Sequence, residues 1–388
     1  MAAATAALSG CSALAPDSGT APFHDGDWHS FANGPTNPSR VPGGAPEAGE
    51  TDVLAGASWP YAPPAVHDGI AYFASERDVV AVTVDGDELW SQSLQSELSG
   101  TLAVDPERAR LYVPTRVAPT ASGPDPTPAL VAVLSLADGS ARDRYRVGTR
   151  RTYGVTVADG AVYVRSATAC VKLAPDGTER WRRPLDPLVY DAYNLGDDTA
   201  TQVAPAVTGN GVYVPDRDAL VKLDPASGRE RWRVGVDTAY AAPVVTDDGG
   251  VVQTGHEETV AVDPGGEERW RRSLGTRAAA AAADDVVYVV PGDIHELDLA
   301  TGETNWRAHV PSEGTAAPVV TDESVLVVSG DVRAFRREVG GLFEPDRLRW
   351  QTSSVHAHEY VSPVVAAGRA LVVGPMGLQV LRPGSAEP

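Results

Sequence analysis

The chain has 388 residues, of which 43% are hydrophobic, and a formal net charge of −20 at pH 7. This hydrophobic content suffices for a packed core. The negative charge argues against nucleic acid or an anionic membrane surface as the main partner, because both require a cationic face. The two cysteines, Cys11 and Cys170, are too few for a disulfide framework, and no Cys/His spacing typical of a zinc site is present. We expect Cys170 to be a small buried residue.

The charged residues are also unusual in kind. Lys172 and Lys222 are the only lysines, and Arg supplies the remaining strong bases. An acidic, lysine-poor chain of this sort resembles proteins of salt-loving archaea, whose surface carboxylates hold water while salt screens their mutual repulsion. A GC-rich codon bias with an ordinary acidic surface is the alternative. We favour the halophilic origin.

Residues 1–26 are predicted to precede the folded domain as a signal remnant and a flexible tether. Residues 8–11 (Leu-Ser-Gly-Cys) match a lipoprotein cleavage box, which predicts lipidation of Cys11. The apolar stretch before it is too short to span a bilayer and lacks a basic region. Either the true start lies upstream or this is an Ala-rich disordered start; we favour the first. The expected location is the extracellular face of the cell membrane, lipid-anchored, with secretion as the alternative.

From residue 27 onward, short apolar runs alternate with turn residues. The clearest unit is Val203–Val236, where alternation over four to six residues predicts strands and Gly, Asn, Asp and Pro mark turns. A lone four-stranded meander is unstable, so repetition is expected. The four predicted strands of this unit are Ala204–Val207, Gly211–Val214, Leu220–Leu223 and Arg231–Val234.

The unit recurs along the chain and usually ends in a strand that carries one aromatic residue. An eighth unit, residues 360–381, lacks that strand, and the isolated strand around Trp28 is expected to supply it. The sequence therefore predicts an all-β fold: an eight-bladed β-propeller of four-stranded antiparallel blades over residues 27–384, with 385–388 as a tail. The aromatics predicted to dock blades are Trp28, Trp90, Tyr145, Trp181, Trp232, Trp270, Trp306 and Trp350. Insertions at Ala118–Pro128, Val189–Thr199 and Glu338–Asp346 are expected to be surface loops.

A motif precedes the closing aromatic: Leu223-Asp224-x-x-Ser227-Gly228-x-x-x-Trp232, and again Leu297-Asp298-x-x-Thr301-Gly302-x-x-x-Trp306. Asp and Ser/Thr are expected to bond backbone N–H groups of a tight turn, with Gly at its positive-φ position. With Ala-Pro-Val-Val at 242–245, these residues make the chain resemble PQQ-type, or outer-membrane-assembly-lipoprotein-type, eight-bladed propellers. The resemblance implies that the aromatics fasten neighbouring blades.

The resemblance also bounds the function. Quinoprotein dehydrogenases of this fold need a vicinal cysteine disulfide, a calcium site and a catalytic Asp, and the chain has no adjacent cysteines and no alignable calcium set. We therefore expect no PQQ, no other cofactor and no enzyme activity, with a PQQ-dependent dehydrogenase as the less favoured hypothesis. The main hypothesis is a monomeric protein-binding or scaffold module whose protein partner is unknown. It would contact the membrane through its lipid anchor alone and would not bind nucleic acid.

Two candidate sites remain. The residues expected at the channel mouth are Tyr61, Arg151, Gln202, Tyr240, Arg277, Thr315 and Tyr360. Such a set suits an anionic or sugar-like ligand, although a simple polar cap on the channel is the favoured alternative. His356 and His358 share one side of a predicted strand and form a weak metal candidate without an evident third ligand.

Overall fold

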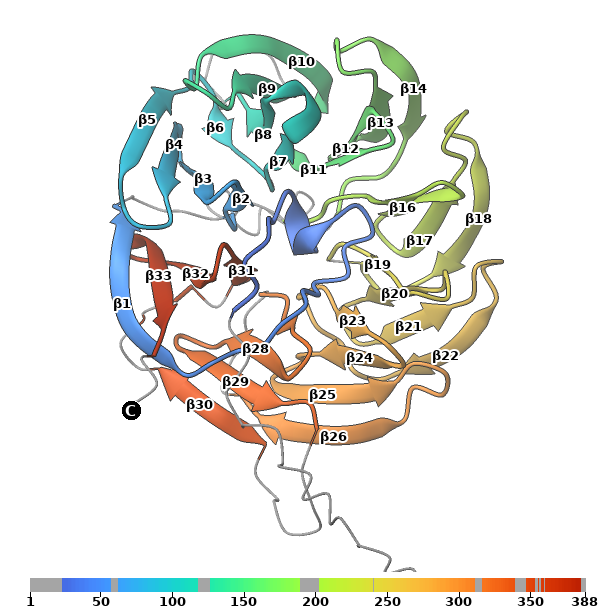
Figure 1. Ribbon diagram of the computed structural model, residues 1–388. Coiled ribbons are helices and arrows are strands. Elements are labelled where there is room, and N and C mark those ends of the chain that lie inside the picture. Colours follow the sequence, from blue (N-terminus) through green and yellow to red (C-terminus); the bar gives the residue numbers. More distant parts are fainter. Residues whose placement is uncertain are drawn as a thin grey trace, which may run out of the picture.

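The computed structural model describes residues 23–56, 62–117, 126–188, 202–239, 241–310, 316–338, 347–352, 355, 357–358 and 360–384. Eight antiparallel sheets stand around a common axis as the blades of a propeller (Figure 1). The predicted all-β, eight-bladed architecture is confirmed. Seven sheets have four strands; in the second blade, β6 and β7 both pair with β8 and together occupy the inner position.

The blades follow one another in chain order, each running from an inner to an outer strand. Blade 1 comprises β2 (Ala65–His67), β3 (Ile70–Ser75), β4 (Asp78–Thr83) and β5 (Glu88–Ser93); blade 2 comprises β6 (Glu97–Leu98), β7 (Ala103–Asp105), β8 (Arg110–Arg116), β9 (Pro128–Ser135) and β10 (Ala141–Thr149); blade 3 comprises β11 (Thr152–Ala158), β12 (Ala161–Ser166), β13 (Ala169–Leu173) and β14 (Glu179–Pro184); blade 4 comprises β15 (Ala206–Thr208), β16 (Gly211–Pro215), β17 (Ala219–Leu223) and β18 (Glu230–Gly235).

The second half repeats the plan. Blade 5 comprises β19 (Val244–Val245), β20 (Val251–Thr254), β21 (Thr259–Val262) and β22 (Glu268–Arg272); blade 6 comprises β23 (Ala281–Ala283), β24 (Val286–Val289), β25 (Asp293–Asp298) and β26 (Thr304–His309); blade 7 comprises β27 (Val319–Val320), β28 (Ser324–Val328), β29 (Val332–Arg336) and β30 (Leu348–Thr352); blade 8 comprises β31 (Val364–Ala366), β32 (Arg369–Gly374), β33 (Gly377–Pro383) and β1 (Ala48–Ala55). Two short 3-10 helices, η1 (Phe31–Asn33) and η2 (Pro106–Arg108), complete the described elements.

The hydrophobic core lies between neighbouring blades. Inner and middle strands are buried on both faces, as in β16, whereas the outer strand β18 alternates between half-buried and exposed residues. One apolar cluster joins Tyr72 and Trp90 of blade 1 to Leu111 and Leu134 of blade 2. Continuous apolar runs in the middle strands follow from this packing, because each blade has a neighbour on either side.

The turn motif adopts the predicted geometry. Asp224 Oδ1 accepts hydrogen bonds from the Ser227 backbone N–H and hydroxyl, both at 2.8 Å, and Gly228 has a φ of 66°. The next strand then carries its aromatic to the blade boundary. The polar groups of these rings donate to backbone oxygens beyond that boundary: Trp90 to Leu136 (2.9 Å), Tyr145 to Pro175 (3.1 Å), Trp181 to Pro225 (3.0 Å), Trp232 to Pro264 (3.3 Å), Trp270 to Leu299 (2.8 Å) and Trp350 to Ala45 (3.0 Å).

A strand from the N-terminal part of the chain does close the ring. The prediction that this strand contains Trp28 is wrong. Strand β1 pairs with β33, with Thr51 opposite Leu381 and Val53 opposite Gln379. Trp28 lies near the axis instead, where its backbone forms a bridge with Val66 of the inner strand β2. The Trp28 ring is buried at the hub and plays no part in the outer edge of blade 8.

The three predicted insertions fall mainly outside the described residues, which omit 118–125, 189–201 and 339–346. In the parts that are described, no helix is long and apolar enough to cross a membrane.

Candidate functional site

Residues 23–47, termed here the axial segment, cross the centre of the ring before the chain reaches β1 (Figure 1). In six blades, the second residue of the inner strand donates its backbone N–H to a carbonyl oxygen of this segment. These bonds run from Val66 to Trp28, Val104 to His29, Val207 to Pro35, Val245 to Thr36, Ala282 to Pro38 and Val320 to Ser39. The axial segment is therefore tied in turn to blades 1, 2, 4, 5, 6 and 7.

Side chains of the axial segment fill the axis. Phe31 and Ala32, exposed by only 2% and 3%, pack against alanines that shortly precede the inner strands of blades 4 to 7: Ala204, Ala241, Ala242, Ala279 and Ala317. The Asn37 side chain donates to the carbonyl oxygens of Ala204 (3.0 Å) and Pro243 (3.1 Å). The small residues at these positions leave room for the ring of Phe31, and the amide of Asn37 satisfies carbonyls that two blades direct inward.

Two of the predicted mouth residues meet directly. The Gln202 side chain donates to the backbone oxygen of Tyr360, and its Oε1 accepts from the Ser362 hydroxyl at 2.9 Å. Gln202 precedes blade 4 and Tyr360 precedes blade 8, and these blades stand opposite each other in the ring (Figure 1). Gln202 therefore spans the axis.

The other mouth residues are not in equivalent environments. Arg151 is buried, at 5% exposure, whereas Arg277 is exposed. Tyr61, Tyr240 and Thr315 lie outside the described residues.

The predicted histidine pair is described in part. His358 is half-buried, its ring stacks on Tyr360 with centroids 4.9 Å apart, and its backbone N–H donates to Val373. Burial lowers the pKa of His358. His356 lies outside the described residues, as does Cys11, so both remain predictions.

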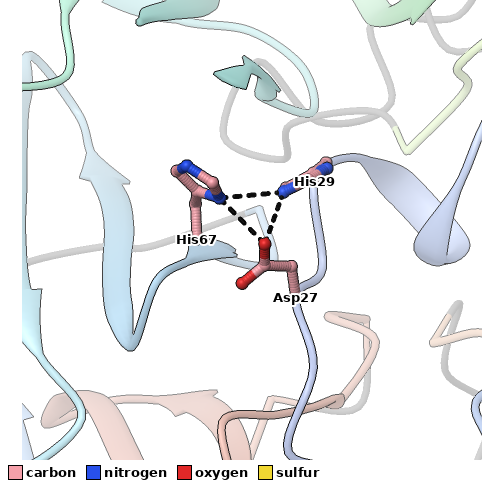
Figure 2. A group of neighbouring side chains, drawn as sticks. All are labelled: Asp27, His29 and His67. Carbon is pink, nitrogen blue, oxygen red and sulfur yellow. Dashed lines mark hydrogen bonds and ion pairs between the residues drawn. The ribbon is translucent and has the colours of Figure 1, made fainter. Parts of the chain in front are cut away.

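A different set of ligand-type side chains converges beside the axial segment. Asp27 and His29 come from this segment and His67 from the end of β2, and the three point toward one another (Figure 2). Asp27 Oδ2 lies 3.0 Å from His29 Nε2 and 2.8 Å from His67 Nδ1, and the two nitrogens are 3.1 Å apart. Within the described part of the chain, this is the group of at least three potential metal ligands.

The surroundings of this cluster favour a charged carboxylate. Partial burial opposes ionisation of Asp27, but the hydrogen bonds from His67 and from the Asp68 backbone N–H, with the nearby imidazoles, hold its pKa below the ordinary value. Sequence reasoning missed this group. The Asp27-x-His29 spacing, which puts two ligands on one side of an extended segment, was the available signal.

Comparisons by sequence and by structure both find assembly factors named BamB among the proteins similar to this chain. The outer membrane protein assembly factor BamB of Nitrosomonas eutropha is 28% identical over 175 residues, which are 44% of this chain and 32% of the relative. The match thus spans about a third of the relative's length. The crystal structure of BamB from Moraxella catarrhalis superposes with a TM-score of 0.66 at 15% identity, covering 89% of this chain and 99% of that one.

An enzyme shares the same architecture. The quinohemoprotein alcohol dehydrogenase of Comamonas testosteroni has a TM-score of 0.67 at 12% identity, covering 93% of this chain and 81% of that one. Likeness at such identities shows the fold alone. The family model described as outer membrane protein assembly factor BamB matches residues 171–264 and 255–374, more than half of the sequence. The chain therefore belongs to the family of PQQ-type repeat propellers that this BamB model defines.

Proposed function

We propose that the chain is a non-catalytic propeller, anchored at the cell surface, that binds partner proteins. Its family, and the description of its sequence relative as an outer membrane protein assembly factor, support a protein-binding scaffold. The observation that carries the proposal is the placement of apolar side chains on the surface. Among the described residues, the exposed large hydrophobics are Val53 (47%), Leu89 (50%) and Met376 (49%).

These three side chains belong to two adjoining blades. Val53 lies on β1, the outer strand of blade 8, Met376 lies in the turn between β32 and β33, and Leu89 lies on β5, the outer strand of blade 1. Across the boundary between these blades, Arg382 of β33 pairs with Asp85 of blade 1 (3.3 Å), and within blade 8 it also pairs with Asp52 of β1 (3.1 Å). Apolar side chains gathered on adjoining blades would give a partner protein an apolar contact area.

The test is crosslinking capture from native membranes in high salt, followed by a comparison of variants. Val53→Glu with Leu89→Glu should remove the specific partner, because burying a carboxylate without a partner opposes association. Thr304→Glu, on the exposed outer strand of blade 6, is the matched control and should retain it. Capture of the same proteins at the same yield by the double variant would overturn the proposed surface.

The anchor and the absence of PQQ are parts of the same proposal. Cys11→Ala should release the protein from the membrane fraction, and retention of the variant there would contradict lipid anchoring.

Phe31 and Ala32 occupy the axis among alanines, which supports a propeller that does not hold a cofactor there. Purified protein mixed with PQQ and calcium should acquire no cofactor absorbance after desalting; stable absorbance would favour the dehydrogenase hypothesis.

A further inference from the structure

The contacts among Asp27, His29 and His67 cannot all be hydrogen bonds. Each ring nitrogen offers a single site, which is either a proton or a lone pair, and a carboxylate oxygen only accepts. If both nitrogens donate to Asp27 Oδ2, two N–H groups face each other across the 3.1 Å between the rings. If one nitrogen is deprotonated, its lone pair faces the carboxylate 2.8 or 3.0 Å away. Protons alone leave one side of this triangle repulsive.

A cation bound to all three atoms removes the conflict. A tetrahedral ion with ligands at about 2.0–2.1 Å separates neighbouring ligand atoms by about 3.3 Å. The observed separations of 2.8, 3.0 and 3.1 Å are a few tenths of an ångström shorter, which small side-chain rotations can correct. Two imidazoles and one carboxylate suit zinc and neighbouring divalent transition metals, whereas calcium and magnesium prefer ligand sets made of oxygen.

Neighbouring groups orient the ligands as a metal site requires. Asp27 Oδ1 accepts the Asp68 backbone N–H at 2.9 Å, which leaves Oδ2 directed at the two rings. His67 Nε2 lies 3.6 Å from the Asp68 carboxylate, beyond hydrogen-bond distance but close enough for a small side-chain rotation to let Nε2–H donate to it while Nδ1 binds the ion.

An ion also has a route to the cluster. The ligand side chains retain exposures of 35% (His29), 34% (Asp27) and 21% (His67). His29 further lines a pocket of about 260 Å³ whose wall includes Asp105, Glu107 and Asp159. These carboxylates outnumber the one arginine of the pocket, Arg108. The resulting negative charge raises the local concentration of cations.

We propose that Asp27 Oδ2, His29 Nε2 and His67 Nδ1 bind one divalent transition-metal ion of the zinc class, which pins the axial segment to blade 1. Two ligands come from the axial segment and the third from the β2–β3 hairpin of blade 1, 38 residues further along the chain. The ion thus joins the same two parts as the backbone bridge between Trp28 and Val66. The fourth coordination position is left for water or an incoming ligand.

The experiment uses tag-free full-length protein stripped with chelator and titrated with Zn²⁺ in excess Mg²⁺, which saturates weak sites on the acidic surface. We expect one Zn²⁺ per chain by calorimetry, and visible d–d absorption of tetrahedral type with Co²⁺. His67→Ala and His29→Ala should each weaken binding by at least about 100-fold. His309→Ala is the matched control, because His309 also bonds one carboxylate, that of Asp293 at 2.9 Å, and should bind as wild type does.

A second readout tests the pinning and does not depend on how well a variant folds. Zn²⁺ should slow hydrogen exchange of backbone amides in residues 24–34 of the wild type, and leave the exchange in Asp27→Asn unchanged. Stoichiometric uptake without slower exchange would overturn the pinning. The site would be overturned if no Zn²⁺ bound in the presence of excess Mg²⁺. It would also be overturned if wild type, His29→Ala and His67→Ala bound Zn²⁺ with equal affinity. Neither result bears on the protein-binding surface of blades 8 and 1.

Discussion

The turn glycine of one blade lies against the aromatic ring that closes the blade before it. A Cβ added to Gly228 would meet Trp181 Cδ2 at 2.7 Å, and one added to Gly302 would meet Trp270 Cδ2 at 2.5 Å. Both glycines have positive φ angles, 66° and 69°. The glycine of the motif therefore serves twice, because it allows the turn and also leaves space for the neighbouring ring.

Gly228→Ala is expected to destabilise the protein by about 2–4 kcal/mol, through backbone strain combined with displacement of the Trp181 ring. Two controls separate these causes. Gly330→Ala meets no atom within 4 Å but keeps a positive φ of 82°, so it should cost about 1 kcal/mol. Gly209→Ala has neither problem and should stay within about 0.5 kcal/mol of wild type. Urea unfolding followed by Trp fluorescence measures all three; equal losses for Gly228 and Gly330 would contradict the contact.

The Asp224 carboxylate predicts a pH dependence. Arg231 and the Ser227 hydroxyl and backbone N–H hold its pKa below the ordinary value. A carboxyl group whose folded pKa is depressed adds stability above its unfolded pKa of about 4 and loses it as the pH falls further. Asp224→Asn keeps the turn geometry but loses the charge, so its deficit relative to wild type should shrink between pH 7 and about 3. Asp159→Asn, at an exposed turn, is the control for the loss of one negative charge. If the stability deficit of Asp224→Asn stayed constant with pH, the assignment to the Asp224 carboxylate would be refuted.

At the scale of elements, local patterns made the blades predictable. The four strands predicted in Val203–Val236 lie within two residues of β15, β16, β17 and β18. The burial expected of Cys170 is also found, and burial raises the pKa of its thiol to about 12. These features depend on alternation and turn residues within some 35 residues of sequence, so a single unit contains the information.

Features that depend on the path of the axial segment were not predictable. Strand β1 reads Ala-Gly-Glu-Thr-Asp-Val-Leu-Ala, with weak alternation, and its partner β33 is more than 300 residues away. The closing role was assigned to Trp28 because other blades end in Trp, although no Gly stands four residues before it as the motif requires. The approach of His67 to Asp27 likewise depends on where the axial segment lies.

Asn37 ties the axial segment to two blades through buried hydrogen bonds. Asn37→Asp keeps the shape and tolerates the φ of 57°, but it replaces the donor amide with an acceptor facing the oxygens of Ala204 and Pro243. We expect a loss of about 2–4 kcal/mol because these groups are buried. Asn210→Asp, at an exposed turn, is the matched control and should be nearly neutral. Equal stability of the two variants in urea unfolding would show that the amide does not hold the segment.

At the scale of the whole molecule, charge sets the response to salt. Ion pairs such as Arg40 with Asp284 (2.8 Å) weaken when they are screened, but they are exposed and each contributes little. The repulsion within a net charge of −20 is screened at the same time. We therefore expect Tm to rise between about 0.1 and 1 M NaCl, as the Debye length falls from about 10 Å to 3 Å.

A variant with fewer carboxylates separates this screening from general salt effects. Glu50→Gln, Asp78→Asn, Glu88→Gln and Asp143→Asn together neutralise four exposed side chains. Because less repulsion remains to be screened, the combined variant should have a higher Tm than wild type at low salt and a shallower rise with added NaCl. Differential scanning calorimetry in NaCl and in KCl measures both slopes. A Tm that falls with salt in the wild type, or slopes that are equal in the two proteins, would show that ion pairs outweigh the net charge.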